Sequence, residues 1–213
     1  MSSFQCSSLA LNRHFPRAIL HGPTFLGGIG IPSPSYRTTK EQINYFLYNI
    51  RRETFIQKSF DASLIYTQLE IGSFQHFFSL SYLRYGHLVT KSMGVQIWSE
   101  TEPHGLFLRP DPSSTWIPHS LGTNDIPLME LATTVYNPKG SAMINQCRLY
   151  LHVISLYDIL TYDLQGIHPS YKQGERPPSH HSTIHWPNYP KPLKNYWQLW
   201  YHFLYIHLQS YGP

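Results

Sequence analysis

The sequence predicts a mainly α-helical protein, an irregular helical bundle with long proline-rich loops and little strand. Three observations predict this class. Apolar residues recur at helical spacing in several segments. The stretches between those segments are rich in proline and glycine, and only residues 105–110, GLFLRP, have strand-like composition. With 41% hydrophobic residues, the 213-residue chain can bury a core. We expect about six or seven helices.

The first half is predicted to contain a disordered serine-rich N-terminus, 1–10, and a region 11–102 with a basic Gly/Pro-rich lead segment and several helices. After a loop, SPSYRT, the first long helix is expected to begin at Thr38, because Glu41 stands at capping-box spacing, and to end near Arg52. Further helices are predicted over 54–71, ending at Gly72, over 74–89, and over 91–101. The apolar positions that define them are Ile43, Phe46, Leu47 and Ile50, then Ile56, Phe60, Leu64 and Leu69, then Phe77, Leu80, Leu83 and His87, and finally Trp98.

The prolines between residues 103 and 123 predict a connection inside the protein rather than a firm domain boundary. The second helical half, 124–213, is expected to begin with a short helix capped by Asn124. Residues 141–160 are apolar over much of a helical circumference, which predicts a central helix. A polar loop follows over 166–190, and a last helix from about Pro192 to Leu208. Because the chain ends almost where that helix ends, we expect a truncated piece of a longer protein.

Composition and charge restrict the function classes. The net charge of +4 is mild, but most of the excess lies in the first quarter. Up to Arg52 the chain has one acidic residue, Glu41, and six basic ones: Arg13, Arg17, Arg37, Lys40, Arg51 and Arg52. Two cysteines make a disulfide framework and a thiolate zinc site improbable. The sequence has no secretory signal and no apolar run long enough to span a bilayer, so we expect an intracellular protein of the nucleus or cytoplasm.

Residues 11–32 carry the strongest local signal, LNRHFPRAILHGPTFLGGIGIP. Pro23, Gly27, Gly28 and Gly30 predict a turn, because glycine accepts positive φ or the close approach of another backbone. An anion site is the alternative, but the glycines lack the Gly-Lys-Ser/Thr sequence of a phosphate loop.

The candidate nucleic-acid-binding residues are basic. Arg13, Arg17, His21 and Arg37 are the primary candidates for phosphate contacts, and Arg51 and Arg52 are secondary ones. A solvated basic face is the alternative for the group, and interaction with a helix C-terminus is the alternative for the last two. Trp197, Trp200 and Tyr201 are the candidates for a base-stacking or partner-docking face. A place in the core is the alternative for the two tryptophans, because tryptophans at this helical spacing more often belong to a core.

Catalytic, metal and cofactor sites are not expected. His180, His181 and His185 lie close together, but flanking prolines place them in a loop without a cysteine pair. A serine hydrolase would need a nucleophile turn such as Gly-x-Ser-x-Gly, and the chain has none. We therefore predict neither an independent enzyme nor a small-molecule substrate.

Four segments, in order, resemble the region downstream of the reverse transcriptase core in open reading frames of non-LTR-type retroelements of diatoms and other microbial eukaryotes. They are NRHFPRAILHGPTFLGGIGIP at 12–32, the first two predicted helices up to Gly72, which contain YTQLEIGS, then NQCRLYLHVISLYDIL at 145–160, and IHWPNYPKPLKNYWQLW at 184–200. The resemblance implies a thumb or connector that follows the fingers and palm of a polymerase and lies beside the template-primer duplex.

The catalytic chemistry of such elements is not implied for this chain. Reverse transcription needs paired aspartates that hold two metal ions, and this sequence offers isolated acids such as Asp158 and Asp163. The favoured hypothesis is a non-catalytic retrotransposon-derived fragment that positions template-primer nucleic acid for an adjacent polymerase domain. Two alternatives remain: a protein-interaction module that docks through its aromatic C-terminal helix, and a degenerate remnant without activity.

Overall fold

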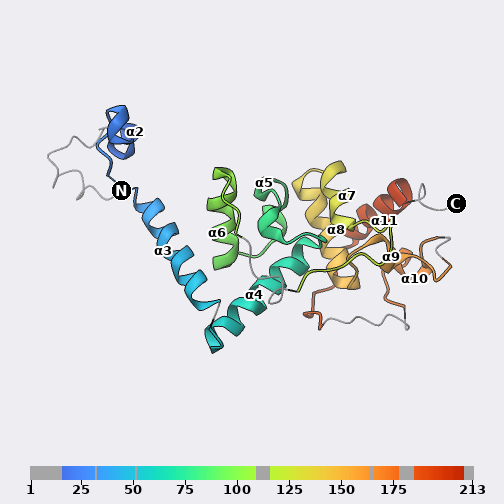
Figure 1. The fold of residues 1–213 in the computed structure, drawn as a ribbon. Coiled ribbons are helices and arrows are strands. Elements are labelled where there is room, and N and C mark those ends of the chain that lie inside the picture. Colours follow the sequence, from blue (N-terminus) through green and yellow to red (C-terminus); the bar gives the residue numbers. More distant parts are fainter. Residues whose placement is uncertain are drawn as a thin grey trace. The chain divides into compact units, whose positions relative to one another are not determined.

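The computed structural model describes residues 16–31, 33–50, 52–108, 116–163, 166–177 and 185–208. Its regular elements in these ranges are helices, labelled in Figure 1, with isolated β-bridges at Pro127–Ser155 and Leu160–Ile167. The predicted mainly α class is therefore confirmed. The chain forms two compact units that divide between Thr54 and Phe55. The predicted proline-rich connection is internal to the second unit, while the predicted disordered N-terminus lies outside the described residues.

The described part of the first unit contains α2 (Arg17–His21), the 3-10 helix η1 (Thr24–Leu26) and α3 (Pro34–Asn49). The prediction that α3 begins at Thr38 is wrong, because Ser33 is the N-cap residue and Pro34 occupies the first helical turn. Proline suits that position, since its fixed φ is helical and its missing N–H has no partner there anyway. The loop predicted for SPSYRT is thus the start of the helix.

The second unit opens with α4 (Phe55–Ile71), close to its predicted bounds. The helix stops at Gly72, which has a φ of +62°, the left-handed conformation that glycine adopts at helix ends. Leu64 and Leu69 are buried as predicted. Ile56 was expected on the same side but is 41% exposed, because it lies in the first turn of the helix, away from the buried end.

The predicted helix over 74–89 is wrong. The chain forms three short elements instead: η2 (Phe77–Ser79), α5 (Tyr82–Tyr85) and η3 (Gly86–Leu88). The buried Gln68 side chain holds the turn before them, because its amide nitrogen donates to the carbonyls of Ser73 and Gln75 and its oxygen accepts from the Phe77 N–H. Leu83, expected on the buried face, is 92% exposed.

The next helix, α6 (Met93–Thr101), matches the prediction. The Ser92 hydroxyl caps it by accepting from the Val95 N–H, and Trp98 is fully buried with its indole N–H donating to the Leu80 carbonyl. A 3-10 turn, η4 (Glu102–His104), continues it. Of the short extended segment predicted at 105–110, residues 105–108 are described and are not in a strand.

The short helix predicted from Asn124 begins later, as α7 (Leu128–Val135). Residues before it pair with a distant segment: the Leu128 N–H donates to the Ile154 carbonyl, and the Leu156 N–H donates to the Ile126 carbonyl. This pairing holds residues 126–127 in an extended conformation, so the helix cannot begin at Asn124.

The central helix predicted over 141–160 is two helices, α8 (Pro138–Leu151) and α9 (Leu156–Ile159). The break falls at His152, whose φ of 61° is left-handed, and α9 starts with a capping box between Ser155 and Asp158. The prediction that α8 is central is confirmed, because it packs against α7, α11, α4 and η3, as Figure 1 shows for its labelled neighbours.

Two helices complete the second unit, α10 (Pro169–Lys172), inside the predicted polar loop, and α11 (Lys194–Leu208), the predicted last helix. Trp200 in α11 donates its indole N–H to the Tyr171 carbonyl of α10 at 3.2 Å. None of the described helices combines the length and apolar character needed to cross a membrane.

Candidate nucleic-acid interface

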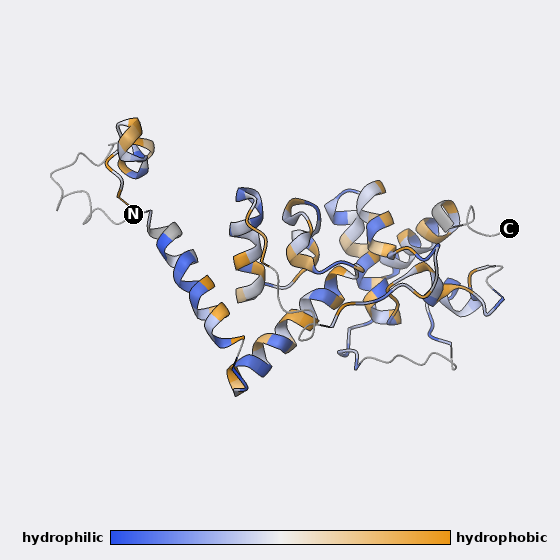
Figure 2. Cartoon of the chain, viewed as in Figure 1, coloured by the Kyte–Doolittle hydropathy of each residue, from blue (hydrophilic) through white to orange (hydrophobic). Residues whose placement is uncertain are grey.

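One side of α3 carries a line of exposed polar side chains that we call the α3 stripe: Arg37, Lys40, Asn44 and Tyr48, followed by Arg52 just beyond the helix. Successive members are three or four residues apart, so they lie above one another on one face. From Arg37 to Tyr48 the stripe extends about 16 Å along the axis, at 1.5 Å per residue. Figure 2 shows the hydrophilic residues distributed along α3.

The opposite side of α3 is buried. Phe46 is 2% exposed and Asn49 is 6% exposed, and both lie about half a helical turn from Lys40 and Asn44. The Asn49 amide donates to the Tyr45 carbonyl one turn earlier. The helix therefore has a fixed inner side, and this side determines which residues face solvent.

The C-terminal end of the stripe combines a cation with an aromatic ring. The Arg52 guanidinium carbon lies 3.8 Å from the centroid of the Tyr48 ring, well within the range of a cation–π contact. Both side chains are exposed. The contact orients the guanidinium, and it leaves planar groups of both residues on the surface.

Acidic side chains are few in this unit. Within residues 16–54 the described cations are Arg17, Arg37, Lys40 and Arg52, and the described acids are Glu41 and Glu53. Glu41 stands one turn after Arg37 on the flank of the stripe, at the spacing of a weak surface ion pair. The remaining charge of the stripe is positive, which favours anionic ligands.

The sequence-predicted binding residues divide into three groups. Arg37 and Arg52 belong to the stripe, whereas Arg17 is exposed on α2. His21 is half-buried, and its Nδ1–H donates to the Ile31 carbonyl at 2.7 Å, so at least one ring nitrogen serves the local fold. Arg13 and Arg51 lie outside the described residues. Sequence reasoning missed Asn44 and Tyr48 and did not propose Lys40 as a contact, although their spacing of three or four residues was a usable signal.

The predicted glycine turn holds the segment around α2 and η1 together. Gly27 and Gly30 have φ of 80° and 71°, and the N–H groups of Ile29 and Gly30 donate to the carbonyls of Ile19 and Gly22. A β-carbon on Gly28 would collide with the Gly22 carbonyl oxygen. Pro23 precedes η1 as its N-cap residue. The backbone donors of this turn bind within the turn, which favours a structural role for it over an anion site.

The predicted docking face on α11 needs correction. Trp197 is 7% exposed and Trp200 is fully buried. Trp197 packs edge-on against Tyr150 of α8, and its ring contacts the backbone at Gly174. These tryptophans belong to the core because they face the central helix, so neither is available to a partner or a base. Tyr201, the third predicted residue, remains 37% exposed.

Buried polar groups elsewhere serve the fold. Arg148 is fully buried and donates to the side chain of Asn145 and to the carbonyls of Leu69, Glu70 and Val153. Burial raises the pKa of the Cys147 thiol to about 12 and thereby keeps it protonated at neutral pH, which makes it a poor nucleophile. Within the described ranges, no three His, Cys, Asp or Glu side chains are placed to hold a metal ion. His185 is exposed, and His180 and His181 lie outside those ranges.

Fold and site thus define a mainly α protein with a basic, partly aromatic helical stripe. Comparison with known proteins adds no relative: no family model, curated protein or solved structure matches the chain.

Proposed function

We propose that the chain is a non-catalytic nucleic-acid-binding element whose α3 stripe contacts the phosphate backbone. The observation that carries the proposal is the alignment of Arg37, Lys40 and Tyr48 on the exposed side of α3, extended by Arg52, which lies just beyond the helix and contacts the Tyr48 ring. Cations spaced along a helix can each neutralise a phosphate and release its counterion, and this release supplies much of the affinity of backbone binding.

The form of the stripe favours a positioning role. Phosphate contacts fix the register of a duplex without reading its sequence, and a single helix of about 24 Å, from its 16 residues, follows several successive phosphates. In a longer retroelement protein, a helix of this kind would serve as the thumb or connector that holds template-primer for an adjacent polymerase domain. The resemblance of residues 12–32 and 145–160 to that region supports this context.

The test is fluorescence anisotropy with a labelled primer-template duplex, measured at several salt concentrations. The triple variant Arg37→Gln, Lys40→Gln, Arg52→Gln should bind more weakly than the wild type. In a plot of log Kd against the logarithm of the salt concentration, the slope of the variant should be lower by up to about 2.7. Each lost phosphate contact removes roughly 0.9 from this slope.

A matched control removes the same charge from the second unit. Lys91, Lys139 and Lys194 are exposed there, and the triple variant Lys91→Gln, Lys139→Gln, Lys194→Gln has the same net charge as the stripe variant. It should retain the wild-type slope. Equal slopes for the two variants would assign binding to overall charge and refute the stripe, while absence of binding by the wild type would refute the function.

A further inference from the structure

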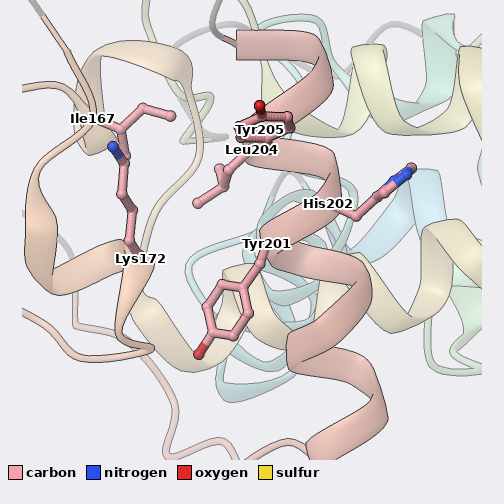
Figure 3. A pocket seen from close by; sticks show the side chains of 6 residues that line it. All are labelled: Ile167, Lys172, Tyr201, His202, Leu204 and Tyr205. Carbon is pink, nitrogen blue, oxygen red and sulfur yellow. The ribbon is translucent and has the colours of Figure 1, made fainter.

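The second unit contains a pocket of about 510 Å³ beside α11, lined by Ile167, Lys172, Tyr201, His202, Leu204 and Tyr205. This volume lies within the ~300–1,000 Å³ range of small-ligand sites. Figure 3 shows Leu204 pointing from α11 towards the segment that carries Ile167 and Lys172. Leu204 is 2% exposed and forms the floor, whereas Tyr205 is 66% exposed at the mouth.

Both walls of the pocket are anchored. The α11 wall is held by Trp200 and Phe203, which are fully buried. The opposite wall is held by Tyr171, the residue before Lys172, because its carbonyl accepts from the Trp200 indole. His202 bonds through Nδ1 to the Tyr136 hydroxyl at 3.1 Å, on the side away from Lys172 in Figure 3. The pocket is therefore preformed and does not depend on a change in the fold.

The lining combines three kinds of group. Leu204 and Ile167 are aliphatic, Tyr201 and Tyr205 present aromatic rings one helical turn apart, and Lys172 supplies an exposed cation. A ligand that satisfies all three has a flat apolar ring and a nearby negative charge. A nucleotide has both, since its base stacks on aromatic rings and its phosphate pairs with lysine.

We propose that this pocket binds one unpaired nucleotide of a single-stranded polynucleotide, with the base stacked on Tyr205 and the phosphate paired with Lys172. The inference rests on the proposed function in that the chain must meet nucleic acid, but it assigns a second contact, for a single strand rather than a duplex. Tyr201 and Leu204 form the apolar surface beneath the base. Such a contact would hold a template overhang while the α3 stripe holds a duplex.

The test uses the full chain and an oligothymidylate with one 2-aminopurine, whose fluorescence changes when the base stacks. Tyr205→Ala should abolish the fluorescence change and raise Kd about 5-fold to 150-fold, the range for loss of one base–aromatic stack. Tyr205→Phe keeps the ring and should bind like the wild type. Lys172→Gln should lower the slope of log Kd against the logarithm of the salt concentration by about 0.7. Lys172→Arg keeps the charge and should leave this slope unchanged.

The control is Tyr162→Ala, which removes another exposed tyrosine of the same unit and should leave the signal unchanged. Wild-type binding by Tyr205→Ala, or an equal loss with Tyr162→Ala, would overturn the proposal. The proposal would also be overturned if the chain bound octanoate but not the oligonucleotide. That result would assign the pocket to small apolar acids. Duplex binding, measured with the pocket variants Tyr205→Ala and Lys172→Gln, tests the α3 stripe separately. Failure of the pocket proposal is therefore distinguishable from failure of the stripe proposal.

Discussion

Replacement of Arg148 by methionine tests whether buried polar contacts hold the second unit together. The Arg148 side chain has no exposed surface, and it donates to the Leu69 carbonyl at 2.6 Å, to the Glu70 carbonyl at 3.0 Å and to the Val153 carbonyl at 3.1 Å. Methionine fills much of the same volume but donates no hydrogen bond. The Glu70 carbonyl keeps a second donor, the Asn145 amide, at 2.8 Å.

The expected cost follows from three buried acceptors that lose the arginine donor: the carbonyls of Leu69 and Val153 and the side-chain oxygen of Asn145. A buried acceptor left without its partner costs about 1–3 kcal/mol, so the variant should lose about 3–9 kcal/mol of the free energy of unfolding. Arg148→Lys should recover only part of this loss, because one ammonium group cannot reach acceptors on both α4 and the α8–α9 connection. The loss is large compared with the total stability of a domain, about 5–15 kcal/mol.

Urea unfolding followed by far-UV circular dichroism measures this loss. Arg84→Met is the matched control, because Arg84 is likewise an arginine with several hydrogen bonds, to Glu130, Thr133 and Thr134, but these lie at the surface. Water replaces those bonds, so the control should cost about 0.5 kcal/mol or less. The reasoning is refuted if Arg148→Met costs no more than Arg84→Met.

Two further predictions concern single residues. Burial lowers the pKa of His76 from 6.5 to about 4. As pH falls, His76 therefore takes up a proton in the unfolded chain before it does so in the folded one. The stability of the second unit should fall as pH decreases from 6.5 towards 4. His76→Asn keeps an acceptor for the Phe78 N–H and should flatten this dependence in urea titrations across pH; an unchanged profile would contradict the assignment. In the first unit, Gly28→Ala forces a β-carbon against the Gly22 carbonyl and should increase hydrogen exchange at the neighbouring turn amides. Gly27→Ala, where the added carbon meets open space but φ is positive, should have a smaller effect, and the reverse order would contradict the geometry.

Much of the helical content was predictable because it depends on local signals. The bounds of α4 and α6 follow from apolar spacing together with a serine cap and a glycine stop, which act within one or two turns. The basic character of the first unit was also visible, and Arg37 and Arg52 of the stripe were among the predicted binding residues. The stripe as a whole was not identified: the spacing of Lys40, Asn44 and Tyr48 places them on one helix face, but only the packing of α3 decides that this face is exposed.

The breaks in the helices were decided by contacts between residues far apart in the sequence. Gln68 of α4 holds the chain in a turn where periodicity predicted a helix, and Arg148 ties the end of α4 to the connection after His152. By itself the sequence determined a mainly α chain with a basic first quarter, because helix periodicity and charge are local properties. Only the tertiary structure decided that the α11 tryptophans are core and that Tyr205 faces a pocket, because burial depends on which helices pack together.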